Sequence, residues 1–184
     1  MTDFVERVVS SEDDCVVVVD NNDVGIGFMT KAAAHDGRGT LHRAFSVFVF
    51  NPDGELLLQQ RAAEKRLWPG RWSNSCCSHP RRGEPMATAV RRRVHEELGL
   101  CLTTAFLFKF EYRAQFDAHC AEHELCWVHV GRSADKPTVN RHEVAAWRYV
   151  DGPTLHDEIA AAPDRFTPWF RIAWPLVAAT AHVL

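Results

Sequence analysis

The alternation of apolar and polar residues divides most of the chain into short strands. A β-branched run at residues 15–20 meets a polar turn cluster, and residues 24–30 complete a predicted hairpin. Two further strands, 43–50 and 55–60, flank residues 51–54 (NPDG), where Pro and Gly suit a turn. Because 43–50 is apolar at nearly every position, we expect this strand to be buried on both faces.

Residues 84–98 show the clearest helical pattern in the chain. Apolar side chains recur there at helical spacing: Ala87, Val90, Val94 and Leu98. Gly99 follows where a C-terminal cap belongs. Residues 31–40 and 61–82 lack periodicity and are expected to be irregular, and long irregular stretches in compact domains are often functional.

The remaining pattern predicts a mixed fold. Strands are expected at 107–112, 122–130 and 147–150, followed by a helix over 168–183 that is interrupted at Pro175. Strands around one strong central helix indicate an α+β class, an α/β sandwich. The length of 184 residues fits one domain over residues 1–184, since domains commonly run to roughly 100–200 residues.

Composition excludes several classes of partner. A net charge of -3 gives no global reason to expect nucleic acid. No apolar stretch approaches the roughly 20 residues of a membrane span, and residues 1–10 lack a secretory signal pattern, so we expect a cytoplasmic protein without membrane attachment. The six cysteines form no CxxC pair and are expected to be free thiols, mostly in the core.

Two sets of residues suggest a metal site. His35, His42 and His79 lie in or beside irregular segments and could converge on one ion, although chance is a rival explanation among ten histidines. Glu122 and Glu124 alternate along a strand and share a face. A cation would relieve their repulsion; protonation of one, or simple solvation at the start of a strand, are the alternatives. Together the five groups suit Zn, Mn or Mg.

The helix and its approach follow the Nudix signature, G-x5-E-x7-R-E-U-x-E-E-x-G-U, where U is apolar. Its acidic residues bind Mg²⁺ on a diphosphate, because hard cations prefer oxygen ligands. Ser78 replaces the opening Gly, and Arg93 replaces a Glu, which weakens the acidic cluster that hydrolytic members use. Arg93 and Glu97 are also spaced for an ordinary surface ion pair.

Three further cations flank the irregular segment: Lys31, Arg61 and Lys65. Each alone is explained by a solvated surface position. Beside a helix that binds diphosphate, they become plausible ligands of phosphate oxygens, Arg as a bidentate fork and Lys as a point charge.

The ordered set of motifs resembles the type 1 isopentenyl-diphosphate isomerases over about residues 16–169. The matching features are Lys31-x3-His35, Leu41-His42, Arg61-x3-Lys65, Trp68-Pro69-Gly70-x-Trp72, Asn74-Ser75-Cys76-Cys77-Ser78-His79-Pro80, the altered Nudix box, Tyr112-Arg113-Ala114 and Glu122-x-Glu124. The resemblance implies a Nudix-type fold of mixed β-sheets packed between helices. It also implies an isoprenyl diphosphate substrate whose double bond is moved by proton addition and removal.

The resemblance also assigns roles to individual residues. One divalent ion, Mn²⁺, Zn²⁺ or Mg²⁺, would be held by His35, His42, His79, Glu122 and Glu124. Glu97 would bind a second ion, Mg²⁺, shared with the diphosphate. Lys31, Arg61, Lys65 and Arg93 would hold the phosphates. Cys77 and Glu124 would transfer protons, with Tyr112 hydrogen-bonded beside Glu124 and the π face of Trp169 bordering the cation.

Several alternatives stay open at this point. Cys77 is assigned because it lies two residues before His79, and Cys76 is the fallback. An ordinary core role is the alternative for Trp169. A Nudix diphosphate hydrolase and a non-catalytic binding module are the rival functions, because fold alone does not determine function. The expected oligomeric state is a monomer or weak dimer.

Overall fold

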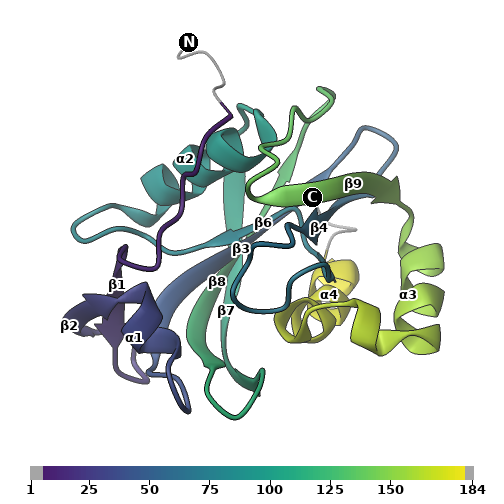
Figure 1. The fold of residues 1–184 in the computed structure, drawn as a ribbon. Helices are drawn as coiled ribbons and strands as arrows, with labels where there is room; N and C mark the ends of the chain where they lie inside the picture. Colours follow the sequence, from purple (N-terminus) through teal and green to yellow (C-terminus); the bar gives the residue numbers. More distant parts are fainter. Residues whose placement is uncertain (1–5, 181–184) are drawn as a thin grey trace.

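The computed structural model describes residues 6–180 and contains a nine-stranded sheet built around β3 (His42–Phe50) (Figure 1). Strand β3 pairs in antiparallel fashion with β1 (Cys15–Val19), β4 (Leu56–Arg61) and β6 (Cys76–Ser78), and in parallel with β8 (Ala121–Arg132). The outer pairings are β2 (Gly25–Thr30) on β1, β5 (Trp72–Ser73) and β9 (Val144–Val150) on β4, and β7 (Thr104–Gln115) on β8. The sheet is therefore mixed.

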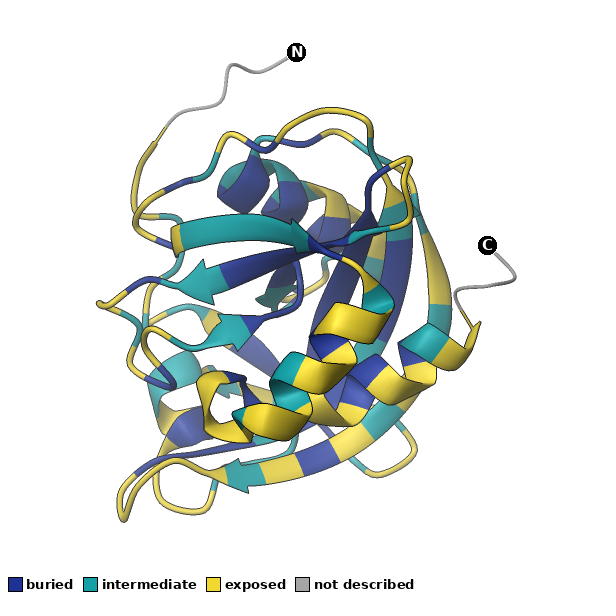
Figure 2. Ribbon diagram, turned by 90° about the vertical axis from the view of Figure 1, so that its right-hand side faces the viewer, coloured by how far each residue is buried: buried dark blue, intermediate teal, exposed yellow. Residues whose placement is uncertain are grey.

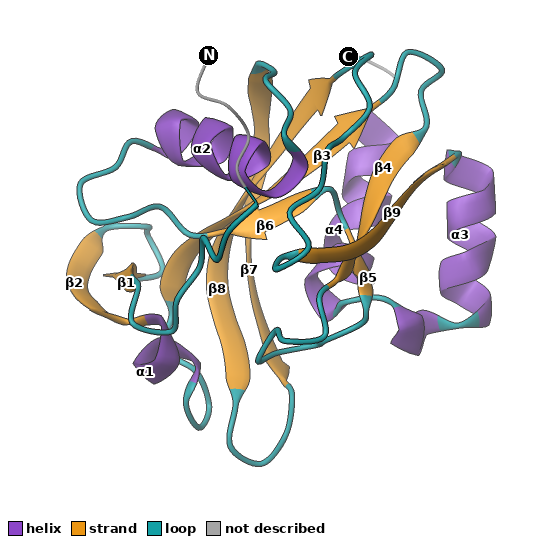
Figure 3. Ribbon diagram, turned by 45° about the horizontal axis from the view of Figure 1, so that its top comes forward, coloured by secondary structure: helices purple, strands orange, loops and turns teal. Residues whose placement is uncertain are grey.

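Helices cover both sides of this sheet, as the tilted view of Figure 3 shows. Helix α2 (Met86–Leu98) lies on one side, and α3 (Gly152–Ala161) and α4 (Pro168–Thr180) lie on the other. Alternate residues of β3 serve two cores: Phe45 and Val47 pack in the cluster with α2, whereas Phe48 and Phe50 pack in the cluster with α4. The predicted α+β class and the burial of this strand on both faces are confirmed.

The central helix begins two residues later than predicted, at Met86, after Pro85 as N-cap. Gly99 adopts φ 66°, and its N–H donates to the His95 carbonyl, so the predicted C-terminal cap is confirmed. Val90, Val94 and Leu98 are buried as expected. Ala87 is exposed, however, and Ala89 takes its place in the core.

Two segments expected to be irregular contain short elements. Residues 31–40 begin with helix α1 (Lys31–His35), because the Thr30 hydroxyl accepts a hydrogen bond from the Ala33 N–H at 3.2 Å and caps it. Residues 61–82 contribute β5 and β6, which form only by pairing with distant strands. Strands this short have too few residues to show the apolar–polar alternation by which a strand is predicted.

The C-terminal part differs from the prediction in two ways. Helix α3 was not expected; Asp151 caps it by accepting from the Thr154 N–H at 2.8 Å, and a short 3-10 turn (Pro163–Arg165) follows. The predicted interruption at Pro175 is wrong, because α4 continues through this residue. Pro175 is exposed, and so is Arg171, whose carbonyl loses its N–H donor to the proline. Residues 181–183 of the predicted helix lie outside the described residues.

Figure 2 shows the exposed outer faces of α3 and α4 and the buried strands behind them. Among residues 6–180, no helix combines the length and the apolar character needed to cross a bilayer. All six cysteines are free thiols.

Candidate metal and catalytic site

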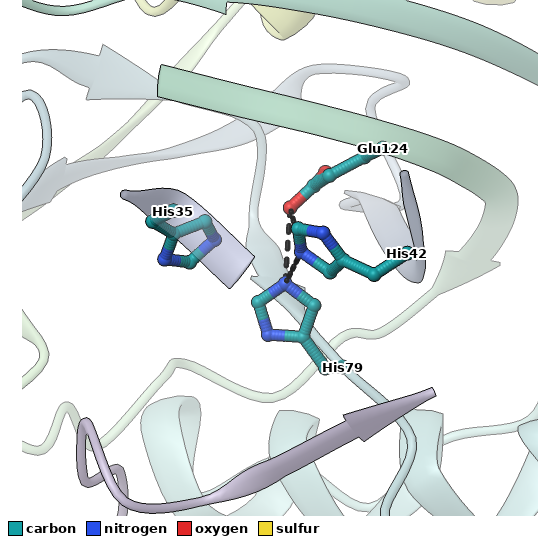
Figure 4. A group of neighbouring side chains, drawn as sticks. All are labelled: His35, His42, His79 and Glu124. Atoms are coloured by element: carbon teal, nitrogen blue, oxygen red, sulfur yellow. Dashed lines mark hydrogen bonds and ion pairs between the residues drawn. The ribbon is translucent and has the colours of Figure 1, made fainter. Parts of the chain in front are cut away.

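Three histidines and one carboxylate converge where β3, β6, β8 and α1 meet (Figure 4). His42 on β3 lies directly opposite Glu124 in the parallel register with β8. His79 follows β6, which β3 also holds, and His35 is the last residue of α1. One donor atom from each of the four residues lies within 4.8 Å of all the others. Sheet register therefore assembles this group from distant parts of the chain.

The backbone fixes the tautomer of one ring in the cluster, that of His42. His42 Nδ1 lies 2.7 Å from the Thr40 carbonyl oxygen and donates to it, which leaves the Nε2 lone pair free. That Nε2 lies 3.1 Å from His79 Nε2, which is 3.0 Å from Glu124 Oε1. Burial, together with the neighbouring imidazoles, lowers the pKa of His42 to about 4 and also lowers the pKa of His79. Neutral imidazoles beside a carboxylate form a donor set that fits a divalent cation.

Glu122 lies beside this group and is unsatisfied. Its Oε2 is 3.1 Å from His35 Nε2, yet neither buried atom completes a hydrogen bond. Both Glu122 and Glu124 are buried, with 6% and 8% exposure, so the solvated alternative is wrong. His123 points away and pairs with Glu111, which confirms the predicted alternation. Orphaned polar atoms at this depth further fit a bound ion.

The two carboxyl groups differ in acidity. Burial and the nearby Glu122 carboxylate raise the pKa of Glu124, whose Oε2 accepts from the Tyr112 hydroxyl at 2.7 Å. Burial also opposes ionisation of Glu122, but the adjacent His35 outweighs it, so the pKa of Glu122 lies below its ordinary value. When no metal is bound, the carboxyl group of Glu124 therefore takes up a proton at a higher pH than that of Glu122.

A cavity of about 320 Å³ opens beside the cluster, and Cys77 lines it. The Cys77 thiol donates to Asn74 Oδ1 at 3.0 Å and accepts from the Trp169 indole N–H at 3.1 Å. Burial raises the pKa of Cys77 to about 11. Cys76 instead packs, fully buried, in the core beneath α2 and does not line the cavity. The two cysteines therefore lie on opposite faces of β6, Cys76 toward the core and Cys77 toward the cavity.

Aromatic side chains form the wall between the thiol and the carboxyl group. Tyr112 lies opposite Glu124 in the β7–β8 register, and its ring centroid is 6.1 Å from that of Trp169. Trp169 lies in the first turn of α4 and donates its indole N–H to Ser73 Oγ at 3.0 Å, and the Ser73 hydroxyl also bonds to that of Thr167 at 2.9 Å. The four residues predicted to act on the substrate therefore border one cavity: Cys77, Tyr112, Glu124 and Trp169.

The predicted phosphate-binding cations also line this cavity, each with a protein partner. Lys31 pairs with Glu12 at 2.9 Å, and Arg61 donates to the Leu67 carbonyl at 2.8 Å while lying 5.2 Å from the Trp169 ring centroid. Lys65 pairs with Glu143. Arg93 donates to Glu97 at 2.6 Å and lies 3.2 Å from Glu143.

The structure modifies the expectations for the altered Nudix box. Arg93 and Glu97 do form the i, i+4 ion pair, but both are 2% exposed, so the pair is buried rather than on the surface. Glu97 also accepts from the Gln59 amide at 3.4 Å and does not line the cavity. Glu84 lies before α2 and binds Arg92 through both carboxylate oxygens.

No role was predicted from the sequence for two residues that contact side chains lining the cavity. Asn74, within a motif quoted above, accepts from the Cys77 thiol. Glu143, 3% exposed at the entrance to β9, contacts two of the predicted phosphate ligands. An acidic residue directly before the apolar Val144 is a weak indication in a chain with 24 acidic residues, so only the fold could identify it.

Solved structures support the fold independently. The chain superposes on DR0079 from Deinococcus radiodurans with a TM-score of 0.66 and 21% identity, covering 80% of this chain and 90% of that one. A MutT protein from Methanosarcina mazei gives a TM-score of 0.61 at 17% identity, over 73% of this chain and 91% of that one. At such identities the likeness establishes the Nudix fold alone.

Sequence relatives carry the assignment further. The NUDIX domain family model matches residues 40–170. A protein from Burkholderia multivorans named isopentenyl-diphosphate Delta-isomerase is 44% identical over 172 residues, which is 91% of this chain and 97% of the relative. Isopentenyl-diphosphate Delta-isomerase 1 from Photorhabdus laumondii is 44% identical over 86% of this chain and 92% of its own length. The chain therefore belongs to the NUDIX family and, within it, to the type 1 isopentenyl-diphosphate isomerases.

Proposed function

We propose that this chain interconverts isopentenyl diphosphate and dimethylallyl diphosphate, as the names of its relatives indicate. A proton adds to the terminal alkene carbon, and another proton leaves the carbon on the far side of the resulting cationic centre. The observation that carries the proposal is that a thiol and a carboxyl group, Cys77 and Glu124, border one aromatic-walled cavity. Two proton-transferring groups on one substrate are what this reaction requires.

Cys77 and Glu124 are the proposed proton-transferring pair. With a pKa raised to about 11 by burial, the Cys77 thiol keeps its proton at neutral pH and has a proton to give. Tyr112 donates to Glu124 Oε2 and fixes that carboxyl group in the cavity wall. Proton addition from one side and removal on the other makes the shift antarafacial.

The aromatic wall protects the reaction from water. Water would trap the cationic centre as an alcohol, so the cavity must stay closed around the alkene. Trp169 is 3% exposed, and its indole N–H is bonded to Cys77, which keeps its ring beside the thiol. A π face in a desolvated site stabilises a neighbouring cation by about 2 kcal/mol.

The histidine group is the proposed site of one divalent ion, Mn²⁺, Zn²⁺ or Mg²⁺, held by His35, His42, His79 and Glu124 with Glu122 beside them. When bound, the ion supplies positive charge that compensates the buried carboxylates. Glu97 is the proposed ligand of a second ion, Mg²⁺, that accompanies the diphosphate. Lys31, Arg61, Lys65 and Arg93 are the proposed ligands of the phosphate oxygens.

An isotope experiment tests the reaction. Purified protein is incubated with isopentenyl diphosphate in heavy water, and we expect deuterium in an intact allylic diphosphate. Release of inorganic phosphate or monophosphate without deuterium uptake would instead support a Nudix hydrolase. Arg93 in place of an acidic residue argues against that alternative, because it removes a ligand from the metal cluster.

Removal of the metal tests the donor group. Dialysis against EDTA should lower activity at least about 100-fold, and readdition of one of the three ions should restore it. Glu124→Gln should lose both bound metal and activity, because one carboxylate is proposed to serve both roles. Full activity in protein whose metal content has been shown to be nil would contradict the assignment.

The proposal extends to a cytoplasmic enzyme that acts as a monomer or weak dimer on a small-molecule diphosphate. Free thiols at all six cysteines suit a reducing compartment. Light scattering on the purified protein at several concentrations measures the oligomeric state directly.

A further inference from the structure

Glu143 is a buried carboxylate at the cavity wall to which the proposed reaction gives no task. It is 3% exposed, and its backbone is fixed on both sides: its N–H donates to the Asn140 carbonyl at 2.9 Å, and its carbonyl accepts from the Ala62 N–H at 3.0 Å. It lines the cavity together with Lys65 and Arg93. A buried carboxylate costs free energy unless it is paired, so its partners are informative.

Its partners are two cations that point into the same cavity. Glu143 Oε2 accepts from Lys65 Nζ in a very short contact and lies 3.2 Å from Arg93 Nη2. The same Arg93 nitrogen donates to Glu97 at 2.6 Å. One ammonium group and one guanidinium group thus meet two carboxylates, and the four side chains together carry no net charge.

We propose that Glu143 is a positioning residue for diphosphate binding, which holds Lys65 and Arg93 in place at the cavity wall before the substrate arrives. The inference rests on the proposed function, since it concerns the cations assigned to the diphosphate. Burial lowers the pKa of Lys65, and the Glu143 carboxylate opposes that change, so Glu143 also favours a charged Lys65. Preorganised charges bind a ligand without a further cost of ordering.

Simple electrostatics makes the opposite prediction. A carboxylate beside a bound diphosphate repels it, so its removal should tighten diphosphate binding. If positioning dominates, removal should weaken binding, because Lys65 loses both its orientation and the charge that favours its protonation. The sign of the change therefore separates the two effects.

The experiment measures the affinity of inorganic diphosphate by calorimetry, using the protein as purified and without added Mg²⁺. Glu143→Gln should weaken binding about tenfold at about pH 7. The loss should be larger at about pH 9, where Lys65 without its carboxylate partner loses its proton. Glu143→Asp keeps the charge and should give an intermediate affinity. Glu158→Gln is the matched control, because Glu158 pairs with Arg148 away from the cavity; its affinity should change less than about twofold.

Equal or tighter binding by Glu143→Gln at both pH values would overturn the inference. Should that variant fail to fold, the double variant Lys65→Gln/Glu143→Gln removes both buried charges together and is less disruptive. It should bind diphosphate more weakly than Lys65→Gln alone, because Arg93 also loses its Glu143 partner; equal or tighter binding would show that repulsion by Glu143, and not positioning, dominates. A parent protein that binds no diphosphate would count against the proposed function itself, whereas an unaffected Glu143→Gln counts only against this inference.

Discussion

A cavity lies at each end of the paired strands β3 and β8, and the two cavities differ in the charge of the residues that line them. Where the pairing begins, His42 faces Glu124, and the cavity beside them measures about 320 Å³. Where it ends, Phe50 faces Arg132 beside a larger hollow of about 940 Å³. Among the described residues that line the larger hollow, the ionisable ones are Arg132 and His156, and both are exposed.

The two cavities differ in buried charge as well as volume, and the end proposed to be functional is the one with the buried charge. An apolar hollow forms at little cost wherever helices and a sheet diverge. Burying carboxylates, imidazoles and a guanidinium together costs several kcal/mol unless each is compensated. A fold maintains such a group where chemistry requires it, so the smaller cavity is the one to test.

The largest effect is expected at the two adjacent cysteines. Cys77→Ala should lower turnover at least about 10³-fold with folding and metal content intact, because it removes a group proposed to transfer a proton. Cys76→Ala should keep turnover near the parent value and lose about 1 kcal/mol of unfolding free energy, because Cys76 is a core residue. Turnover numbers and urea unfolding of both variants measure this; the reverse pattern would move the role to Cys76.

A smaller effect is expected at two tryptophans of α4, since Trp169 borders the polar cavity and Trp174 the apolar hollow. Trp169→Leu should lower kcat about thirtyfold through loss of the π face. Trp174→Leu should change kcat less than about twofold and cost about 2 kcal/mol of unfolding free energy. Equal losses of kcat in the two variants would mean that the helix, not the cavity, is responsible.

The smallest effect concerns a buried histidine outside both hollows. The His129 nitrogens have no hydrogen-bond partner among the described residues, and burial lowers the pKa of His129 below its ordinary value of 6.5. The unfolded chain therefore binds this proton more readily, and stability is lost as the pH falls below about 6.5. His129→Leu should raise the free energy of unfolding by about 1 kcal/mol. It should also lose less of that free energy than the parent as the pH falls from about 7 to about 5, as measured by urea unfolding. An unchanged pH dependence would contradict this account.

Local patterns predicted most of the elements but missed α1, α3, β5 and β6, and spaced motifs predicted the chemistry; neither predicted the long-range pairings. The Nudix helix and its Gly99 cap follow from side-chain periodicity and backbone conformation within a few residues. The partner of Lys65 lies 78 positions away, and no local pattern specifies Glu143. Pro175 was misjudged for a related reason: whether a helix tolerates proline depends on the exposure of the freed carbonyl, which tertiary structure decides.

The assembly of the histidine group has a consequence for the order of events during folding. His79 and Glu124 are 45 positions apart, and His42 meets Glu124 only when the parallel β3–β8 pairing has formed. Non-local pairings of this kind form late, because their loop-closure entropy must first be overcome. A newly made chain therefore lacks the proposed ion site until this pairing has formed. Uptake of an ion at the proposed site would then report that the β3–β8 pairing has formed, and ion at 100 times its dissociation constant would add about 2.7 kcal/mol against unfolding.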